Sequence, residues 1–258
     1  VSGTHGKTTV SAMTASILQS KYGDVGYLIG GVLGDGSWSA RLGSNEYFIV
    51  EADEYDSAFF DKRSKFIHYF PNILAINNIE FDHADIFDDL TPILKQFSHL
   101  LRTIPANGQV VFHENDQTTK HLVDKENWFD VYSIGNDKQF YYDETKNLFI
   151  FNGKEYDLDE LPFFGEHNYK NALMAMCLAY LCNVPYEESF QALKNYSGVK
   201  RRLEVIFHGN THLVYDDFAH HPTAIEAVSE AIKSKYASKM IGIIELASNT
   251  MKSGRHGN

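Results

Sequence analysis

The feature that most constrains the fold is a glycine-rich turn at residues 3–9, which reads Gly-Thr-His-Gly-Lys-Thr-Thr. Residues 10–18 follow it with small and aliphatic side chains that favour a helix. The backbone N–H groups of such a turn bind phosphate, the Lys7 ammonium reaches terminal phosphates, and the Thr8 hydroxyl can ligate Mg²⁺. The general pattern also has a glycine six residues before the lysine, and that position is Val1 here. A glycine turn that only caps a helix is the alternative.

Both ends of the chain are abrupt. A phosphate loop is normally fed by a buried strand, and almost no strand precedes residue 3. The apolar run at residues 240–244 predicts a strand with nothing after it to cover the sheet. We therefore expect this chain to be an internal piece of a longer protein.

Composition excludes several classes of protein. The 258 residues are 43% hydrophobic and 22% charged, which is ordinary for a globular protein with a sizeable core. No stretch approaches the roughly 18–20 apolar residues that cross a bilayer, so we expect no membrane insertion. The formal charge of −11 argues against nucleic-acid binding, whereas one loop and one divalent ion can still bind phosphorylated ligands. Cys177 and Cys182 suit neither a metal knuckle nor a disulfide, which favours a reducing cytoplasm.

Short apolar runs predict a mixed α/β chain. Residues 47–50 and 73–76 have the pattern of buried parallel strands, and each runs into polar residues at its carboxyl end. We further expect strands at residues 109–112, 128–134 and 211–215, a hairpin of residues 140–142 and 148–151, and helices at residues 90–102, 168–182 and about 222–236.

Four carboxylates follow the first of these strands. They are Glu51, Asp53, Glu54 and Asp56. Carboxylates gathered at the end of an apolar strand are costly unless they are solvated or neutralised by a cation. Because the carboxyl ends of strands in an open α/β sheet line the ligand crevice, we expect these acids near the phosphate loop. A solvated acidic loop is the alternative.

The second strand is followed by residues 77–85, which include Asp82 and His83. Histidine and carboxylate together suit a divalent ion whose other positions hold phosphate oxygens and water. A helix cap or a surface histidine is the alternative. We expect His83 to converge with the phosphate loop and the first acidic cluster on one crevice at the carboxyl edge of the sheet.

Three further polar clusters lie downstream, and none of them by itself distinguishes a ligand site from ordinary polar surface. Asn168 and Asn171 fall on one face of a new helix at i, i+3, either toward a ligand or as simple N-caps. Arg202 belongs to an arginine pair that could equally be a solvated linker. Residues 215–222, which include Asp217, form another loop between a strand and a helix.

Read in order, these segments resemble the Mur ligase family, the ATP-dependent amide-forming enzymes of peptidoglycan synthesis. The resemblance covers essentially the whole chain, and the family's shorter phosphate loop accounts for Val1. It implies an α/β fold: a P-loop central ATPase domain with a mainly parallel sheet flanked by helices and a small β-hairpin region, followed by the truncated start of a Rossmann-like C-terminal domain. Residues 1–200 would be the central domain without its leading strand and residues 201–258 the start of the next, with an N-terminal UDP-sugar domain absent.

Residues 51–66, 80–90 and 217–224 are most similar to one branch of that family. This branch attaches a recovered murein tripeptide, L-alanyl-γ-D-glutamyl-meso-diaminopimelate, to UDP-N-acetylmuramate in peptidoglycan recycling. The resemblance implies a bacterial cytoplasmic ligase that uses ATP and Mg²⁺ and forms an acyl phosphate. The branch that adds L-alanine to the same nucleotide sugar is the first alternative. A catalytically silent P-loop nucleotide-binding module is an alternative from another class.

The resemblance also implies roles for individual residues. Lys7, His83 and Arg202 would be catalytic, and Asp217 is a candidate for the ribose hydroxyls. The expected metal ligands are Thr8, Glu51 and His83. The residues expected to bind the nucleotide are Gly3, Thr4, His5, Gly6, Lys7, Thr8, Thr9, Asn168, Asn171, Arg202 and Asp217.

Overall fold

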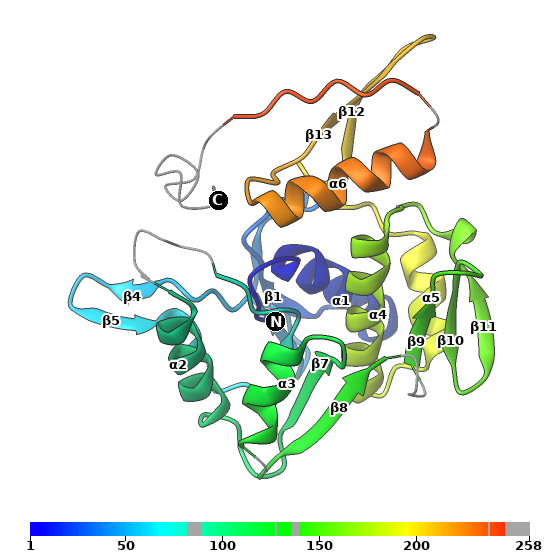
Figure 1. Cartoon of the computed structure of the whole chain (residues 1–258). Helices are drawn as coiled ribbons and strands as arrows, with labels where there is room; N and C mark the ends of the chain where they lie inside the picture. Colours follow the sequence, from blue (N-terminus) through cyan, green and yellow to red (C-terminus); the bar gives the residue numbers. More distant parts are fainter. Residues whose placement is uncertain (82–88, 127, 136–139, 237, 246–258) are drawn as a thin grey trace.

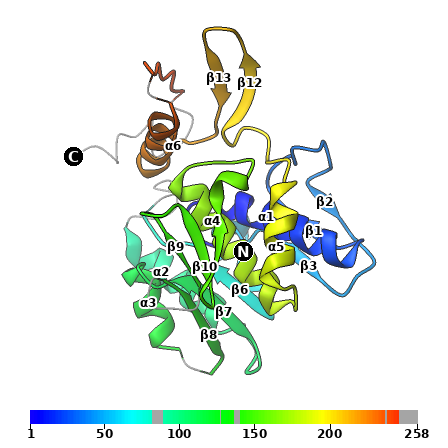
Figure 2. The same ribbon diagram turned by 90° about the vertical axis from the view of Figure 1, so that its right-hand side faces the viewer.

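The computed structural model describes residues 1–81, 89–126, 128–135, 140–236 and 238–245. Its central sheet has two three-stranded parts. The strand labels in Figures 1 and 2 together locate them. In the first part, the strand order is β2 (Ala40–Arg41), β1 (Gly26–Leu28) and β3 (Phe48–Val50), with β1 parallel to β3 and antiparallel to β2. In the second part, β6 (Ile73–Ile76), β7 (Gln109–His113) and β8 (Asp130–Ile134) follow in order and are all parallel.

The first two residues lie between these parts and join them. On one side, the Val1 amino group donates to the Val50 carbonyl at 2.8 Å, and the Val1 carbonyl accepts from the Ala52 N–H at 2.7 Å. On the other side, the Ser2 N–H donates to the Ala75 carbonyl at 2.8 Å. This two-residue stretch therefore places the glycine-rich turn at the carboxyl edge of the sheet, between β3 and β6.

Helices cover both faces of the sheet (Figures 1 and 2). On one face, α1 (Lys7–Tyr22) packs against α4 (Glu166–Leu181) and α5 (Tyr186–Lys194), and on the other lie α2 (Leu90–Leu101) and α3 (Gln117–Asp124). The alternation of side chains along β7 separates the two cores, since Val111 belongs to the first and Val110 and Phe112 to the second. Two of the parallel strands, β3 and β6, are apolar at every position, as predicted, although Phe48 of β3 is half exposed.

A small antiparallel sheet packs beside α4. It contains β9 (Phe140–Asp143), β10 (Leu148–Phe151) and β11 (Lys154–Asp157). The predicted hairpin is confirmed, and a third strand extends it through a turn at Asn152 and Gly153, both of which have positive φ. Phe151 stacks on Tyr186 of α5 with a centroid distance of 4.4 Å, which ties this sheet to the helices.

The remaining elements are two antiparallel hairpins, a helix and two short 3₁₀ segments. They are β4 (Asp56–Ala58) with β5 (Asp61–Ser64), β12 (Glu204–His208) with β13 (Leu213–Asp216), α6 (Pro222–Lys235), and the 3₁₀ segments Lys65–His68 and Leu158–Glu160. None of the described helices is both long and apolar enough to cross a bilayer.

Most of the predicted elements are confirmed, but the strand expected at residues 240–244 is wrong. This segment is irregular, and Ile241 and Ile243 are exposed. In the described part of the chain, no strand pairs with it, so its apolar side chains have no sheet on which to pack.

The packing of α2 on the sheet predicts a large effect for Phe97→Ala. Phe97 is fully buried and contacts Phe66 at a centroid distance of 5.1 Å. Truncation should reduce the free energy of unfolding by about 3–5 kcal/mol, because it leaves a cavity in the core. Denaturant unfolding followed by circular dichroism measures this change.

The matched control is Phe60→Ala at the turn between β4 and β5, where Phe60 is 91% exposed. This variant should change the free energy of unfolding by less than about 0.5 kcal/mol. Equal effects of the two substitutions would contradict the described packing of α2.

Candidate functional site

A cavity of about 810 Å³ opens at the carboxyl ends of β3, β6 and β7. Its walls come from the glycine-rich turn, the residues that follow these strands, the start of α4, and the segment that leads into α6. Of the residues predicted from the sequence, those that line it are Thr4, His5, Gly6, Lys7, Thr8, Thr9, Glu51, Asn168, Asn171, Arg202 and Asp217. Gly3 does not line the cavity, and His83 lies outside the described residues.

The glycine-rich turn packs closely on the segment that follows β6. Gly3 has a φ of 127°, and a Cβ there would lie 2.8 Å from the Asn78 carbonyl oxygen. Gly6 has a φ of 80°, and a Cβ there would lie 2.4 Å from Oδ1 of Asn171. Glycine is therefore needed at both positions for conformation and for space. The turn is further held by the His5 N–H, which donates to Oδ1 of Asn78 at 2.7 Å.

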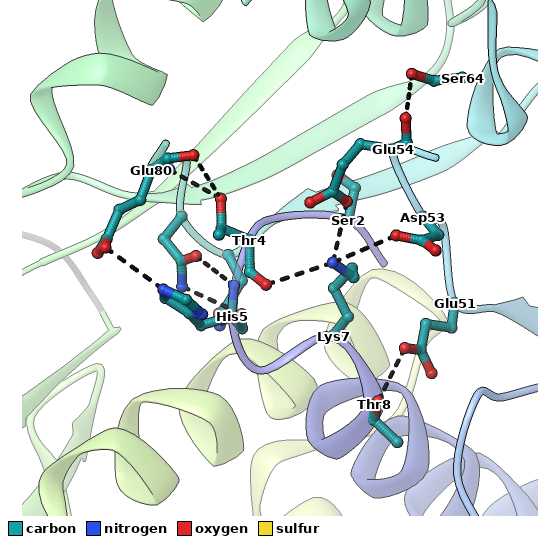
Figure 3. A network of polar contacts seen from close by, with 12 residues as sticks. Ser2, Thr4, His5, Lys7, Thr8, Glu51, Asp53, Glu54, Ser64 and Glu80 are labelled. Carbon is teal, nitrogen blue, oxygen red and sulfur yellow. Dashed lines mark hydrogen bonds and ion pairs between the residues drawn. The ribbon is translucent and has the colours of Figure 1, made fainter. Parts of the chain in front are cut away.

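Lys7 is held by two carboxylates of the segment that follows β3 (Figure 3). Its Nζ lies 3.0 Å from Oε2 of Glu54 and 3.7 Å from Oδ1 of Asp53. Burial by itself lowers the pKa of Lys7, but the negative charges of Glu54 and Asp53 outweigh burial and raise that pKa above its usual value. The ammonium group therefore stays charged beside the cavity.

Thr8 and Glu51 form a second pair beside Lys7 (Figure 3). The Thr8 hydroxyl donates to Oε1 of Glu51 at 2.8 Å, and Oε2 of Glu51 accepts from the Gly30 N–H at 2.6 Å. A hydroxyl and a carboxylate are hard oxygen donors of the kind that Mg²⁺ prefers. These two side chains therefore fit an octahedral divalent ion that takes its other ligands from phosphate and water.

The start of α4 presents amides to the cavity. Gly165 occupies the N-cap position, so neither asparagine caps this helix and that alternative is wrong. Asn168 donates to the Phe164 carbonyl at 3.0 Å, and buried Asn171 accepts from Nδ2 of Asn77 at 2.9 Å. The Asn77–Asn171 contact links α4 to the end of β6.

Arg202 and Asp217 close the opposite side of the cavity. Both oxygens of Asp217 accept backbone N–H groups, from Leu203 and from Ala219, each at 2.7 Å. The Arg202 guanidinium lies over the Phe218 ring at 5.3 Å, and burial lowers the pKa of Arg202. Asp217 therefore holds the turn that places Arg202 at the cavity wall.

Three further residues of this site were not assigned a role from the sequence. Glu54 was recognised only as part of an acidic cluster, and the cluster does not reveal which carboxylate meets Lys7. Asn77 lies in a predicted loop, and its partner is 94 residues away. His113 ends β7 and lines the cavity, and burial lowers its pKa to about 4. No local pattern marks His113.

Comparison with known proteins gives consistent results. Residues 1–179 match the family model described as Mur ligase middle domain. A Haemophilus influenzae protein, UDP-N-acetylmuramate–L-alanyl-gamma-D-glutamyl-meso-2,6-diaminoheptandioate ligase, is 44% identical over 99% of this chain and 58% of its own. A Desulforamulus reducens UDP-N-acetylmuramate–L-alanine ligase is 33% identical over 95% of this chain and 54% of its own. A crystal structure of a Psychrobacter arcticus murein peptide ligase matches with a TM-score of 0.71 and 36% identity, covering 92% of this chain and 54% of that one.

The chain thus spans 58% of the length of the H. influenzae relative. The solved relative shares the mixed α/β arrangement, with a parallel sheet flanked by helices, that the sequence predicted. The family model matches more than half of the chain. On this evidence, the chain belongs to the Mur ligase family.

Proposed function

We propose that this chain forms the ATP-binding part of a ligase that joins L-alanyl-γ-D-glutamyl-meso-diaminopimelate to UDP-N-acetylmuramate. The observation that carries the proposal is that Lys7, Thr8 and Glu51 meet at one cavity beside a glycine-rich turn. Backbone N–H groups at a helix N-terminus, a charged lysine and a pair of oxygen ligands are the parts that phosphoryl transfer needs. The nature of the substrates rests on the 44% identity to the H. influenzae ligase.

We infer a division into two domains from the end of the family match and from the bounds of the helices and strands. Residues 1–200 would form the central ATP-binding unit, and residues 201–258 would begin the following domain. The family match ends at residue 179, α5 ends at Lys194, and the next strand begins at Glu204. The connecting residues include Gly198 and Arg201, which both have positive φ, so the chain changes direction there.

The chain's own residues suit a reaction in two steps. In the first, a carboxylate oxygen of the muramate attacks the γ-phosphorus of ATP, which gives an acyl phosphate and ADP. In the second, the uncharged amine of the peptide attacks the acyl carbon, the C–O bond to phosphate breaks, and the nitrogen gives up one proton, so that the products are the amide and hydrogen phosphate. Negative charge gathers on the phosphoryl oxygens in the first step. Lys7 and Arg202 line the cavity and would stabilise this charge.

Lys7 must exchange partners for this role. In the described structure, its ammonium group bonds Glu54, so phosphate oxygens would replace this carboxylate or share the ammonium with it. Thr8 and Glu51 would hold Mg²⁺, which when bound neutralises charge on the β- and γ-phosphates. Asn168, Asn171 and Asp217 line the same cavity and would contact the rest of the nucleotide.

The two alternatives have less support. The L-alanine-adding relative is 33% identical to this chain, against 44% for the tripeptide ligase. A silent nucleotide-binding module would not need both a phosphate-binding lysine and a metal-binding pair, and the positions of Lys7, Thr8 and Glu51 beside one cavity support both roles.

The proposed metal pair predicts that Thr8→Val selectively weakens binding of ATP with Mg²⁺. The substitution keeps the shape of the side chain but removes its hydroxyl ligand. Affinity for a non-hydrolysable ATP analogue with Mg²⁺ should fall about tenfold, or about 1.4 kcal/mol. Affinity without Mg²⁺ should stay the same. Isothermal titration calorimetry on the 258-residue chain measures both.

Thr14→Val is the matched control, because Thr14 lies in the same helix and its hydroxyl donates to the Val10 carbonyl at 2.7 Å. This variant should bind the analogue with Mg²⁺ as the unsubstituted chain does. If Thr8→Val and Thr14→Val behave alike, the hydroxyl of Thr8 is not a metal ligand.

The proposed acceptor gives a second prediction. A peptide with a free carboxylate and a diamino acid offers more contacts that can orient the reacting amine than free L-alanine does. A protein that carries this chain together with the remaining length of its relatives should use the tripeptide at least about tenfold better in kcat/KM, or about 1.4 kcal/mol. Competition between both acceptors, read as nucleotide-linked product, measures the ratio. A preference for L-alanine would assign the chain to the sister branch.

A further inference from the structure

A histidine–glutamate–histidine cluster lies beside the glycine-rich turn. His5 belongs to the turn, Glu80 follows β6, and His221 is the N-cap residue of α6. One possible ligand atom from each lies within 4.8 Å of the other two. We propose that these three side chains bind a divalent transition-metal ion of the zinc class, at a site separate from the Thr8–Glu51 pair.

The spacing of the cluster suits tetrahedral zinc. Zinc bonds to imidazole nitrogen at about 2.0–2.1 Å, so neighbouring ligand atoms in a tetrahedron are roughly 3.3 Å apart. Nε2 of His5 lies 3.4 Å from Oε2 of Glu80, and the rings of His5 and His221 have a centroid distance of 4.6 Å. A small adjustment of the His221 ring would bring all three atoms to one ion.

The three side chains of this cluster are better ligands for zinc than for magnesium. Two imidazoles and one carboxylate are typical of zinc sites that keep a fourth position open, whereas Mg²⁺ prefers oxygen ligands and retains water. His5, Glu80 and His221 all line the large cavity, so the fourth position is accessible from it.

His5 is poorly satisfied without an ion. Its Nε2 atom is shielded from solvent and makes no hydrogen bond with any described residue. The contact with Glu80 at 3.4 Å is longer than a normal N–H···O hydrogen bond. A bound ion would supply the missing partner.

Glu80 and His221 are already oriented by their surroundings. The Thr223 hydroxyl donates to Oε2 of Glu80 at 2.9 Å, and the Thr223 N–H donates to Nδ1 of His221 at 3.3 Å. Nε2 of His221 contacts the Phe81 carbonyl at 3.3 Å. Such outer contacts orient metal ligands in known sites. These two contacts of His221 are each 3.3 Å long, and one of them would be exchanged for the ion.

The site is separate from the phosphate-binding pair. In Figure 3, His5 and Glu80 face each other on one side of the turn, and Lys7, Thr8 and Glu51 lie on the other. A bound ion would tie α6 to the turn and to the end of β6. It would therefore fasten the segment after residue 200 to the central sheet.

The test is a titration of the 258-residue chain with Zn²⁺, and with Co²⁺ as a spectroscopic probe, in the absence of nucleotide. The unsubstituted chain should bind one Zn²⁺ that a large excess of Mg²⁺ does not displace. Co²⁺ should give the strong visible absorption of a tetrahedral site. Glu80→Gln and His221→Asn should each weaken Zn²⁺ binding at least about tenfold.

These two variants are chosen to preserve the fold. In Glu80→Gln, the amide oxygen can still accept the hydrogen bond from the Thr223 hydroxyl, and in His221→Asn the new side chain is a good N-cap for α6. His220→Asn is the matched control, because His220 is the neighbouring histidine and is not part of the cluster. It should bind Zn²⁺ as the unsubstituted chain does.

Unchanged Zn²⁺ affinity in Glu80→Gln or His221→Asn would overturn the proposal, as would an equal loss in His220→Asn. If a variant does not fold by circular dichroism, the Co²⁺ spectrum of the unsubstituted chain decides, and a weak octahedral spectrum overturns the proposal. Because no nucleotide is present, the result is independent of the proposed ligase activity.

Discussion

The pairing of residues 1 and 2 between β3 and β6 is the constraint on which the site depends. Val1 is bonded to the end of β3, and Ser2 is bonded to β6. The glycine-rich turn must therefore leave the sheet at the point where both strands end. Glu51 follows one of these strands and residues 77–80 follow the other. The glycine-rich turn, a carboxylate and two asparagine amides therefore meet at one edge of the sheet.

Charge at this edge is organised in pairs. The chain is strongly acidic, whereas the proposed ligand, ATP, is itself highly negative. Burying Lys7 against Glu54 keeps the ammonium charged, and the hydrogen bond from Thr8 to Glu51 holds a hydroxyl and a carboxylate together beside the same cavity. Without Glu54, the buried ammonium group of Lys7 would lose its nearest opposite charge, and an unpaired buried charge destabilises the folded state. Because Glu54 acts by holding Lys7, it is a positioning residue.

Much of the fold could be predicted from the sequence, because the signals are local. The runs that became β3 and β6 are apolar throughout, as expected for strands in a parallel sheet, and the residues that became α2 and α4 show helical spacing. The strand β11 was missed although the Asn-Gly turn at residues 152–153 is a strong hairpin signal. Residues 240–244 look like a strand by composition but lack a paired neighbour among the described residues.

The site could be predicted in its residue types but not in its contacts. The glycine-rich turn identifies Lys7 and Thr8 directly, whereas Glu51 was distinguished from the other carboxylates of its cluster only by the resemblance to the Mur ligase family. The choice of Glu54 as the partner of Lys7 depends on tertiary geometry, and so does the pairing of Asn77 with Asn171. The cluster of His5, Glu80 and His221 joins three segments that only the fold brings together.

We have proposed that the turn of residues 3–9 binds the triphosphate of ATP, with Lys7, Thr8 and Glu51 around it. A crystal structure of this chain with Mg²⁺ and a non-hydrolysable ATP analogue tests it most directly. We expect the triphosphate along the turn, a phosphate oxygen within hydrogen-bond distance of Nζ of Lys7, and Mg²⁺ bonded to the oxygens of Thr8 and Glu51. A triphosphate bound elsewhere in the cavity, with Lys7 contacting only Glu54 and Asp53, would contradict the claim.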